Sequence, residues 1–189
     1  YAATNGGLSI STDGGNSWSN TFTTDGLSSN TVHDVFASGS NIYAATDAGL
    51  SITTDVGNTW INKTTTDGLG TTVVHNTFAY GNTVYAATEG GLSISTDGGN
   101  TWINKIINGH YVSDVFVLNG TIYAATQGGL SISIDGGDSW INKTTADGLG
   151  SNDVNGVFTF NGTIYAATEG GLSISTDGGN TWINNTGMV

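Results

Sequence analysis

The chain has 189 residues and a formal net charge of −12, with 30 glycines and neither proline nor cysteine. This length is sufficient for one domain with a hydrophobic core, and the lack of cysteine excludes disulfides and thiolate zinc sites. Its basic residues are Lys63, Lys105 and Lys143, and there is no arginine. Because nucleic acids and anionic membranes are bound through Lys and Arg, we expect no nucleic-acid partner. No apolar run approaches the ~18 residues of a membrane span, so we expect no membrane insertion.

A segment YAAT recurs five times, at intervals of 42, 42, 38 and 42 residues. The short interval arises because Ile106–Tyr111 replaces the longer connector seen at Thr144–Asp153. A period near 40 residues with short strands inside is typical of propeller blades. We therefore predict one domain over residues 1–189, built from five repeat units. The units are anchored at Tyr1, Tyr43, Tyr85, Tyr123 and Tyr165.

Each unit contains four strand-like segments in the same order. The first is apolar and ends in a tight turn such as Asn161-Gly162, which predicts a hairpin to the IYAAT segment. The third, GLSIST, alternates Leu and Ile with Ser, as expected of a half-buried strand. The fourth, TWINKT, leads through a DGLGSN connector into the next unit, and no segment has helical periodicity. The fold class is therefore all-β. First strands are predicted at Val32–Phe36, Val74–Phe78, Val112–Phe116 and Val154–Phe158.

One blade is predicted to be incomplete. The chain enters at the second strand of its first unit, at Tyr1, so that nineteen strands leave the innermost position of that blade open. Met188-Val189 is too short for a full strand at ~3.3 Å per residue, although it could begin one. Proteins normally cover an unpaired strand edge. We therefore expect self-association, or a neighbouring domain, to complete the open blade.

An eight-residue motif, S/T-x-D-x-G-x-T/S-W, separates the third and fourth strands. Its Asp can accept hydrogen bonds from turn amides, its glycines tolerate positive φ, and its Trp supplies a large apolar surface. The pattern resembles the Asp-box of sialidases, sortilin-type receptors and many other propellers. The resemblance implies a five-bladed β-propeller of four-stranded antiparallel blades, in which the box is a stabilising hairpin away from any active site. The residues concerned are Asp13, Trp18, Asp55, Trp60, Asp97, Trp102, Asp135, Trp140, Asp177 and Trp182.

A second resemblance covers Asp147–Ser175, with the sequence DGLGSNDV…FNGTIYAATEGGLSIS. It is similar to the repeat of bacterial two-component-regulator propellers, where DGL-x-x-N-x-V precedes the inner strand. The pattern is lost at Ile106–Tyr111. In those proteins the propeller is an extracytoplasmic sensor module, which implies a secreted or cell-surface location here.

Enzymatic activity is not expected. A sialidase needs an arginine cluster to bind a carboxylate, and this chain has no arginine. Nine acidic residues lie outside the Asp-boxes and leave a pair of hydrolytic carboxylates formally open. Most of them occupy equivalent turn positions in several units, which favours a structural role.

Acidic side chains are predicted to gather at the blade end opposite the Asp-boxes, where connectors meet the turns after the second strands. Carboxylates in glycine-bearing loops are calcium ligands. These residues therefore either bind calcium weakly or are solvated turn acids that cap local backbone, and no other cofactor is expected. The candidate calcium ligands are Asp25, Asp67, Asp147, Glu89 and Glu169.

The histidines His33, His75 and His110 lie near the starts of first strands and could meet near a central channel. The fourth of these strands has Asn155 at the position of His33 and His75, which favours isolated polar residues over a metal site. Five N-x-S/T sequons are also predicted to be exposed and usable in a glycosylating host. They begin at Asn62, Asn119, Asn142, Asn161 and Asn184.

The sequence is consistent with two functions. We favour a secreted or surface-displayed propeller without catalysis, which serves as a structural or assembly module and polymerises through its incomplete blade. The alternative is a binding module, either a lectin-like propeller that binds glycans between its blades or a ligand-sensing domain.

Overall fold

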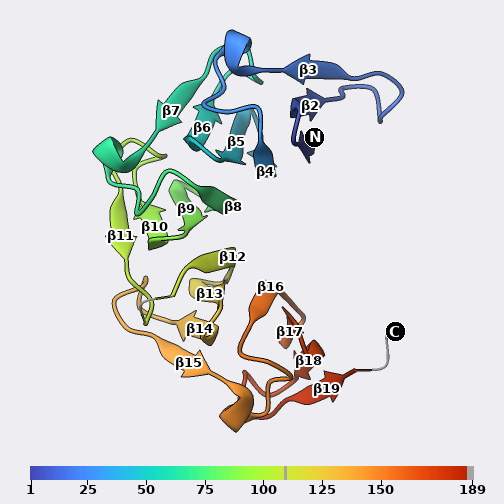
Figure 1. Cartoon of the computed structure of the whole chain (residues 1–189), viewed down its shortest axis with the longest axis vertical. Helices are drawn as coiled ribbons and strands as arrows, with labels where there is room; N and C mark the ends of the chain where they lie inside the picture. The colour runs from blue at the N-terminus through green and yellow to red at the C-terminus, as the bar shows by residue number, and fades with distance from the viewer. Residues whose placement is uncertain (109, 187–189) are drawn as a thin grey trace. The chain divides into compact units, whose positions relative to one another are not determined.

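The protein is described by a computed structural model that covers residues 1–108 and 110–186. Within these residues, nineteen strands form five antiparallel sheets, numbered here as blades in chain order (Figure 1). The first blade has three strands and each of the others has four. The predicted all-β, five-bladed architecture with an incomplete first blade is therefore confirmed. Met188-Val189, the predicted start of a further strand, lies outside the described residues.

The strands are short, and the outermost strand of every blade has three residues. The blades are β1 (Ala2–Thr4), β2 (Gly7–Ile10) and β3 (Ser19–Thr21); β4 (Val32–Ser38), β5 (Asn41–Thr46), β6 (Gly49–Thr53) and β7 (Ile61–Lys63); β8 (Val74–Tyr80), β9 (Thr83–Thr88), β10 (Gly91–Ser95) and β11 (Ile103–Lys105); β12 (Val112–Leu118), β13 (Thr121–Thr126), β14 (Gly129–Ser133) and β15 (Ile141–Lys143); and β16 (Val154–Phe160), β17 (Thr163–Thr168), β18 (Gly171–Ser175) and β19 (Ile183–Asn185).

Three single turns of 3₁₀-helix, which the sequence did not predict, lie in the DGL connectors. Each turn is three residues long, too short to produce a helical pattern of apolar residues. An aspartate closes each turn and is followed by a left-handed glycine, as Asp67 is by Gly68 (φ 107°). The turns are η1 (Thr23–Asp25), η2 (Thr65–Asp67) and η3 (Thr145–Asp147).

The chain divides into two compact units, which are treated separately below. The first consists of residues 1–89 and 93–104, and the second of residues 90–92 and 105–189. The single domain over residues 1–189 therefore stays a prediction.

The second blade illustrates the pairing within a blade. Its order is β4-β5-β6-β7, and Phe36, Tyr43, Ile52 and Ile61 lie opposite one another across the four strands. The inner strand is two residues longer than predicted because pairing continues to Ser38, beside the turn. Each inner strand also has a register shift after its first residue, as between Val32 and Asp34. Such a bulge changes the direction of the side chains that follow it.

Neighbouring blades pack face to face. We call the side that a blade presents to its successor the forward face; on the second blade it comprises Phe36, Tyr43, Ala45, Leu50 and Ile52. Inner and second strands of the third blade pack on it, together with a leucine from the connector and a tryptophan. Because the alanines on these faces are fully buried, the sheets can approach closely. The same arrangement holds between the first and second blades, and between the fourth and fifth.

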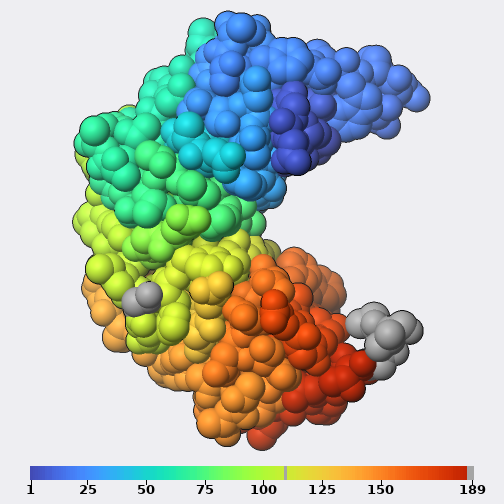
Figure 2. Space-filling model, viewed as in Figure 1, coloured from blue at the N-terminus to red at the C-terminus, as the bar shows by residue number. Residues whose placement is uncertain are grey.

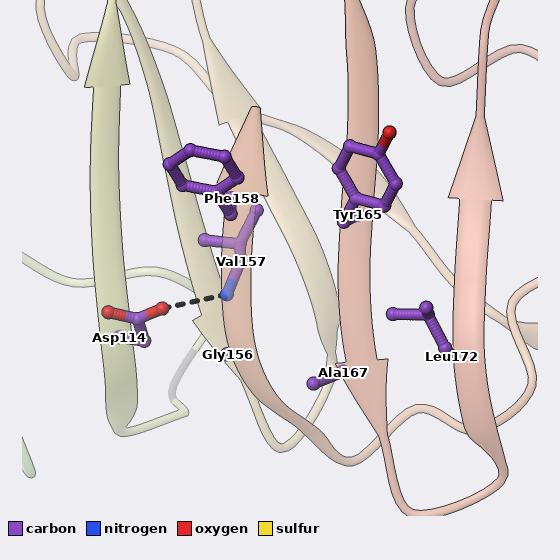
Figure 3. A pocket seen from close by; sticks show the side chains of 7 residues that line it. All are labelled: Asp114, Gly156, Val157, Phe158, Tyr165, Ala167 and Leu172. Carbon is purple, nitrogen blue, oxygen red and sulfur yellow. Dashed lines mark hydrogen bonds between the residues drawn. The ribbon is translucent and has the colours of Figure 1, made fainter. Parts of the chain in front are cut away.

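Half-buried carboxylates link inner strands of the second and third blades, and of the fourth and fifth. Oδ2 of Asp34 accepts a hydrogen bond from the backbone N–H of Thr77 (3.0 Å), and Oδ2 of Asp114 accepts one from Val157 (2.7 Å; Figure 3). Burial raises the pKa of Asp34. The third blade has Asn76 at this position, and the fifth has Gly156, which cannot form such a link.

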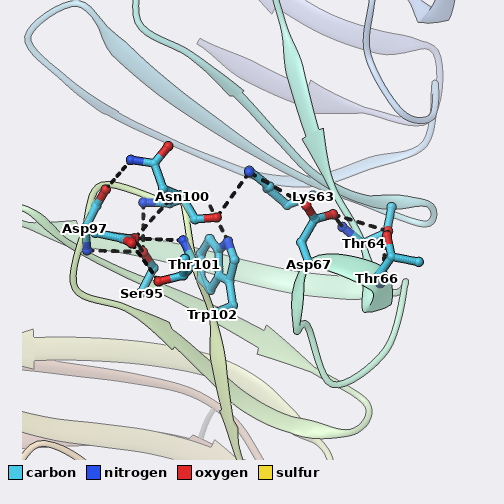
Figure 4. A network of polar contacts seen from close by, with 10 residues as sticks. Lys63, Thr64, Thr66, Asp67, Ser95, Asp97, Asn100, Thr101 and Trp102 are labelled. Atoms are coloured by element: carbon cyan, nitrogen blue, oxygen red, sulfur yellow. Dashed lines mark hydrogen bonds and ion pairs between the residues drawn. The ribbon is translucent and has the colours of Figure 1, made fainter.

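The Asp-containing motifs form hairpin loops, which we call the Asp hairpins (Ser11–Trp18, Thr53–Trp60, Ser95–Trp102, Ser133–Trp140 and Ser175–Trp182). In the third blade, Oδ1 of Asp97 accepts the backbone N–H of Thr101 (2.8 Å), and Oδ2 accepts its hydroxyl (2.6 Å; Figure 4). The hydroxyl of Ser95 donates to Oδ1 (2.8 Å), and Nε1 of Trp102 donates to Gly99 O (3.0 Å). The aspartates of the other four hairpins accept the same bonds from the residue four positions later.

These hydrogen bonds stabilise the ionised aspartates. The hydroxyl and the backbone N–H of Thr101 lower the pKa of Asp97 from 3.8 to about 2. Hydrogen bonds of the same kinds lower the pKa of Asp13, Asp55 and Asp177 to about 2 and also lower that of Asp135. Because the folded pKa lies below the ordinary value, this stabilisation is present above about pH 4 and is lost as the pH falls toward 2.

The link between the fourth and fifth blades can be tested with Asp114→Ala. The substitution leaves the buried N–H of Val157 without its acceptor, so the free energy of unfolding should fall by about 1–3 kcal/mol. Urea denaturation followed by circular dichroism measures the change. Asp114→Asn keeps an amide oxygen at this place and should lose less; equal losses for the two variants would show that the hydrogen bond is not the cause.

The contribution of the Asp hairpins can be tested with Asp97→Asn, which keeps the shape of the side chain but removes its charge. The urea midpoint should fall at pH 7. Because Asp97 is one of several aspartates with a lowered pKa, the loss of stability between pH 4 and pH 2 should be smaller in the variant than in the wild type. Parallel denaturation series of both proteins measure the difference, and identical pH profiles would contradict the assignment.

Candidate functional site

The two ends of a blade can be distinguished by hydrogen bonds, as the second and third blades show. At one end the connector bonds the turn after the second strand, as in Asp47 N to Thr31 O (3.3 Å). At the other end the Asp hairpin bonds the turn between the first two strands, as in Gly98 N to Asn82 O (2.9 Å). In the second blade, the connector and the Asp hairpin therefore lie at opposite ends of the inner strand.

The candidate calcium ligands of the connectors act as local caps. The carboxylates of Asp25, Asp67 and Asp147 accept the backbone N–H of the residue that precedes each 3₁₀ turn (2.8, 2.9 and 2.9 Å). In Asp147 this bond is the main cause of a lowered pKa. Glu89 lies near His75, and the backbone N–H of Glu169 donates to Asp153 O. Across residues 1–108 and 110–186, no three His, Cys, Asp or Glu side chains are grouped to hold a metal ion, and calcium stays an untested expectation.

Two of the three histidines lie together in the first unit. The rings of His33 and His75 have centroids 5.7 Å apart. Nε2 of His33 is 2.6 Å from Oδ1 of Asp47, and Nε2 of His75 is 3.9 Å from Oε1 of Glu89. Burial and the neighbouring His33 lower the pKa of His75, so it titrates below its usual range. His110 belongs to the second unit, where its backbone N–H donates to Ile107 O (3.0 Å).

Two lysines contact the Asp hairpin of the following blade, and this contact was not predicted from the sequence. Nζ of Lys63 donates to Asn100 O of the following Asp hairpin (3.3 Å), and Nζ of Lys105 donates to Oδ1 of Asp138 (2.8 Å; Lys63 is drawn in Figure 4). Asn100 and Asp138 hold the same place in successive hairpins. The sequence did contain an indication of this contact, because Lys63, Lys105 and Lys143 each lie at the end of the fourth strand of their unit.

A pocket of about 260 Å³ lies between the second and third blades, beside Lys63. Its walls combine the apolar side chains of Ile52 and Ile61 with the amides of Asn41 and Asn82, and the Asp hairpin closes one side. The pocket therefore lies at the blade end that carries the Asp hairpins, whereas the candidate calcium ligands were predicted at the opposite end.

The sequons fall into two structural groups. Asn119 and Asn161 occupy exposed turns with φ of 52° and 49°. The other three are each held by hydrogen bonds: Asn62 Nδ2, for example, donates to Gly26 O (3.0 Å), and its Oδ1 accepts the hydroxyl of Ser51 (2.7 Å). Asn142 and Asn184 are bonded in the same way.

The most unusual feature is the inner edge of the first blade. β1 pairs with β2, and the described residues provide no strand on its other side. Its equivalents β5 and β9 are paired on both sides. Tyr1 is accordingly 45% exposed, against 3% for Tyr43 and 8% for Tyr85.

Comparisons with known proteins identify the fold of this chain but assign it to no family. No family model and no curated protein sequence matches the chain. The described part of the chain contains no helix that is long and apolar enough to cross a membrane.

Several solved structures are similar. The extracellular domain of a putative hybrid two-component system from B. thetaiotaomicron superposes with a TM-score of 0.78 at 17% identity, over 92% of this chain and 25% of that one. An ancestral GH74 enzyme gives 0.68 at 21% identity, over 84% of this chain and 24% of that one. YCF48 bound to a D1 peptide gives 0.67 at 19% identity, over 96% of this chain and 62% of that one. The chain thus spans about a quarter of the first two proteins, and these likenesses show that it has the β-propeller fold.

Proposed function

We propose that this chain is a non-catalytic, extracellular β-propeller module that acts in assembly by accepting a partner strand at the inner edge of its first blade. The observation that carries the proposal is the one-sided pairing of β1. An edge of this kind presents unpaired N–H and C=O groups, which an added strand satisfies through main-chain hydrogen bonds.

The four inner strands of the chain indicate the sequence of such a partner. Each begins with a valine that is at most 3% exposed, as Val74 is, and each has phenylalanine at its fifth position. Phenylalanines of successive blades contact one another: the ring centroids of Phe36 and Phe78 are 4.8 Å apart, and those of Phe116 and Phe158 are 4.9 Å apart. A strand that begins with valine and carries phenylalanine four residues later therefore suits the open edge.

Other observations support an assembly role without catalysis. The chain lacks the arginines that a carboxylate-binding sialidase site requires, and the carboxylates of the 3₁₀ turns are engaged in capping. An extracellular location is supported by the extracellular domains among the similar structures. Copies that donate strands in succession would form a filament.

A labelled peptide with the sequence of residues 32–38, VHDVFAS, tests the proposal by fluorescence anisotropy. It should bind saturably at one site per chain and shift the amide signals of residues 2–4 in an NMR spectrum. A scrambled peptide, and one with its phenylalanine replaced by alanine, serve as controls. If light scattering shows a strictly monodisperse monomer and the peptide does not bind better than the controls, the assembly function is wrong.

A second candidate, a carbohydrate-binding or ligand-sensing propeller, is favoured by the pocket beside Lys63. Its mixture of amide groups and aliphatic side chains suits a sugar, which offers both hydroxyls and an apolar ring face. Screening against a glycan array, with and without calcium, tests this function. Binding that Lys63→Ala abolishes and the equivalent Lys143→Ala preserves would support this pocket; an array without hits would argue against it.

A further inference from the structure

The second and third blades carry a pair of histidines at equivalent positions. His33 is the second residue of β4, and His75 is the second residue of β8. These two inner strands lie side by side in the first unit (Figure 1), and the atoms of their blades, light blue to green in Figure 2, pack without a gap. The same position holds Ser113 in the fourth blade and Asn155 in the fifth. The packing thus pairs two imidazoles, whose ring centroids are 5.7 Å apart.

Each of these imidazoles has a carboxylate beside the same ring nitrogen. Nε2 of His33 lies 2.6 Å from Oδ1 of Asp47, and Nε2 of His75 lies 3.9 Å from Oε1 of Glu89. Asp47 and Glu89 also share one repeat position, directly after the second strand. A carboxylate that accepts the Nε2–H of a neutral imidazole leaves the lone pair of the ring on Nδ1. Such carboxylate–histidine pairs support the histidine ligands of metal ions, because they fix the tautomer and raise the basicity of the ring.

The separation of the two rings suits one metal ion held between them. Zn²⁺ binds imidazole nitrogen at ~2.0–2.1 Å, so two rings on a tetrahedral ion have centroids about 5.2 Å apart. The 5.7 Å between His33 and His75 is close to this value. Their side chains are 31% and 28% exposed, so the rings can turn and water can reach the ion. Water is needed as a further ligand, because the described residues contain no group of three His, Cys, Asp or Glu side chains that could hold a metal.

Charge at this place favours a cation. Burial and the neighbouring His33 lower the pKa of His75, so its ring is neutral at pH 7. An imidazole must be neutral to bind a metal ion. Asp47 and Glu89 add two negative charges beside the rings, in a chain whose net charge is −12. These charges raise the local concentration of divalent cations.

We propose that His33 and His75 bind one divalent transition-metal ion, of the class of Zn²⁺, Cu²⁺ and Ni²⁺, between the second and third blades. Nδ1 of each ring is the ligand, water completes the coordination, and Asp47 and Glu89 are positioning residues that hold Nε2–H. Imidazole suits these ions, whereas Ca²⁺ and Mg²⁺ prefer oxygen ligands. The ion joins the two blades at the end of the second blade that lies opposite its Asp hairpin. This inference is independent of strand acceptance at β1.

Calorimetric titration of the metal-free chain with ZnCl₂ at pH 7.5 tests the proposal. The wild type should bind one Zn²⁺ per chain, and His33→Asn and His75→Asn should each weaken binding at least about tenfold, because each removes a ligand. Both variants should fold, since Asn155 holds this position in the fifth blade, and circular dichroism checks this. His110→Asn is the matched control: it removes the third histidine, which belongs to the second unit, and should bind Zn²⁺ as the wild type does.

NMR spectra of the wild type locate the ion without any variant. Addition of Zn²⁺ should shift the ring signals of His33 and His75 and leave those of His110 unchanged. Affinity should fall between pH 7.5 and pH 5.5, because protons compete for the rings. A wild type that does not bind Zn²⁺, ring signals that do not shift, or affinity unchanged in both asparagine variants would overturn the proposal. Displacement of Zn²⁺ by an equal concentration of Ca²⁺ would show that carboxylates are the ligands, and would overturn it as well.

The role of the carboxylate is tested separately with Asp47→Asn. Without a negative acceptor for Nε2–H, Zn²⁺ affinity should fall about 10–100-fold, and the ring ¹⁵N signals of His33 should move toward those of the other tautomer. Asp138→Asn makes the same change of charge in the second unit, at a place where the other four Asp hairpins have asparagine. Equal losses of affinity in the two variants would show that only net charge matters and that Asp47 does not position the ring.

Discussion

Burial of each sheet against its neighbour is the constraint on which this structure depends. A sheet of three or four short strands cannot bury both of its faces by itself, and three apolar clusters among the described residues each combine residues of two blades. Alanines in the second strands, 0% exposed in Ala44, Ala45 and Ala86, let the sheets approach closely enough to exclude water. Stability is thus a property of blade pairs, as in other repeat proteins.

Polar contacts also join neighbouring blades, both at the inner strand and at the outer edge. The carboxylate of Asp34 holds the inner strand of the next blade through Thr77 N, and Lys63 reaches the next Asp hairpin at Asn100 O. The hairpin itself is rigid because Asp97 satisfies the backbone and hydroxyl of Thr101 at once. The second blade is therefore fixed on the third at both its inner and its outer end.

A structure built in this way has surfaces wherever a blade lacks a neighbour. The unpaired edge of β1 belongs to the same class of feature. The carboxylates of the 3₁₀ turns and the asparagines of three sequons, by contrast, are engaged in hydrogen bonds of the fold.

The sequence by itself determined the strands, their turns and the number of blades, because period-two alternation and Gly-Asn turns act over a few residues. It also predicted that the first blade has three strands among the residues given, as the structure shows. Only the tertiary structure decided which side chains act between blades: Asp34 and Thr77 are 43 positions apart, as are Asp114 and Val157, and nothing local pairs them. The pairing of His33 with His75 and the pocket beside Lys63 were likewise decided by packing, since each of these residues has equivalents elsewhere in the repeat and differs from them in its neighbours.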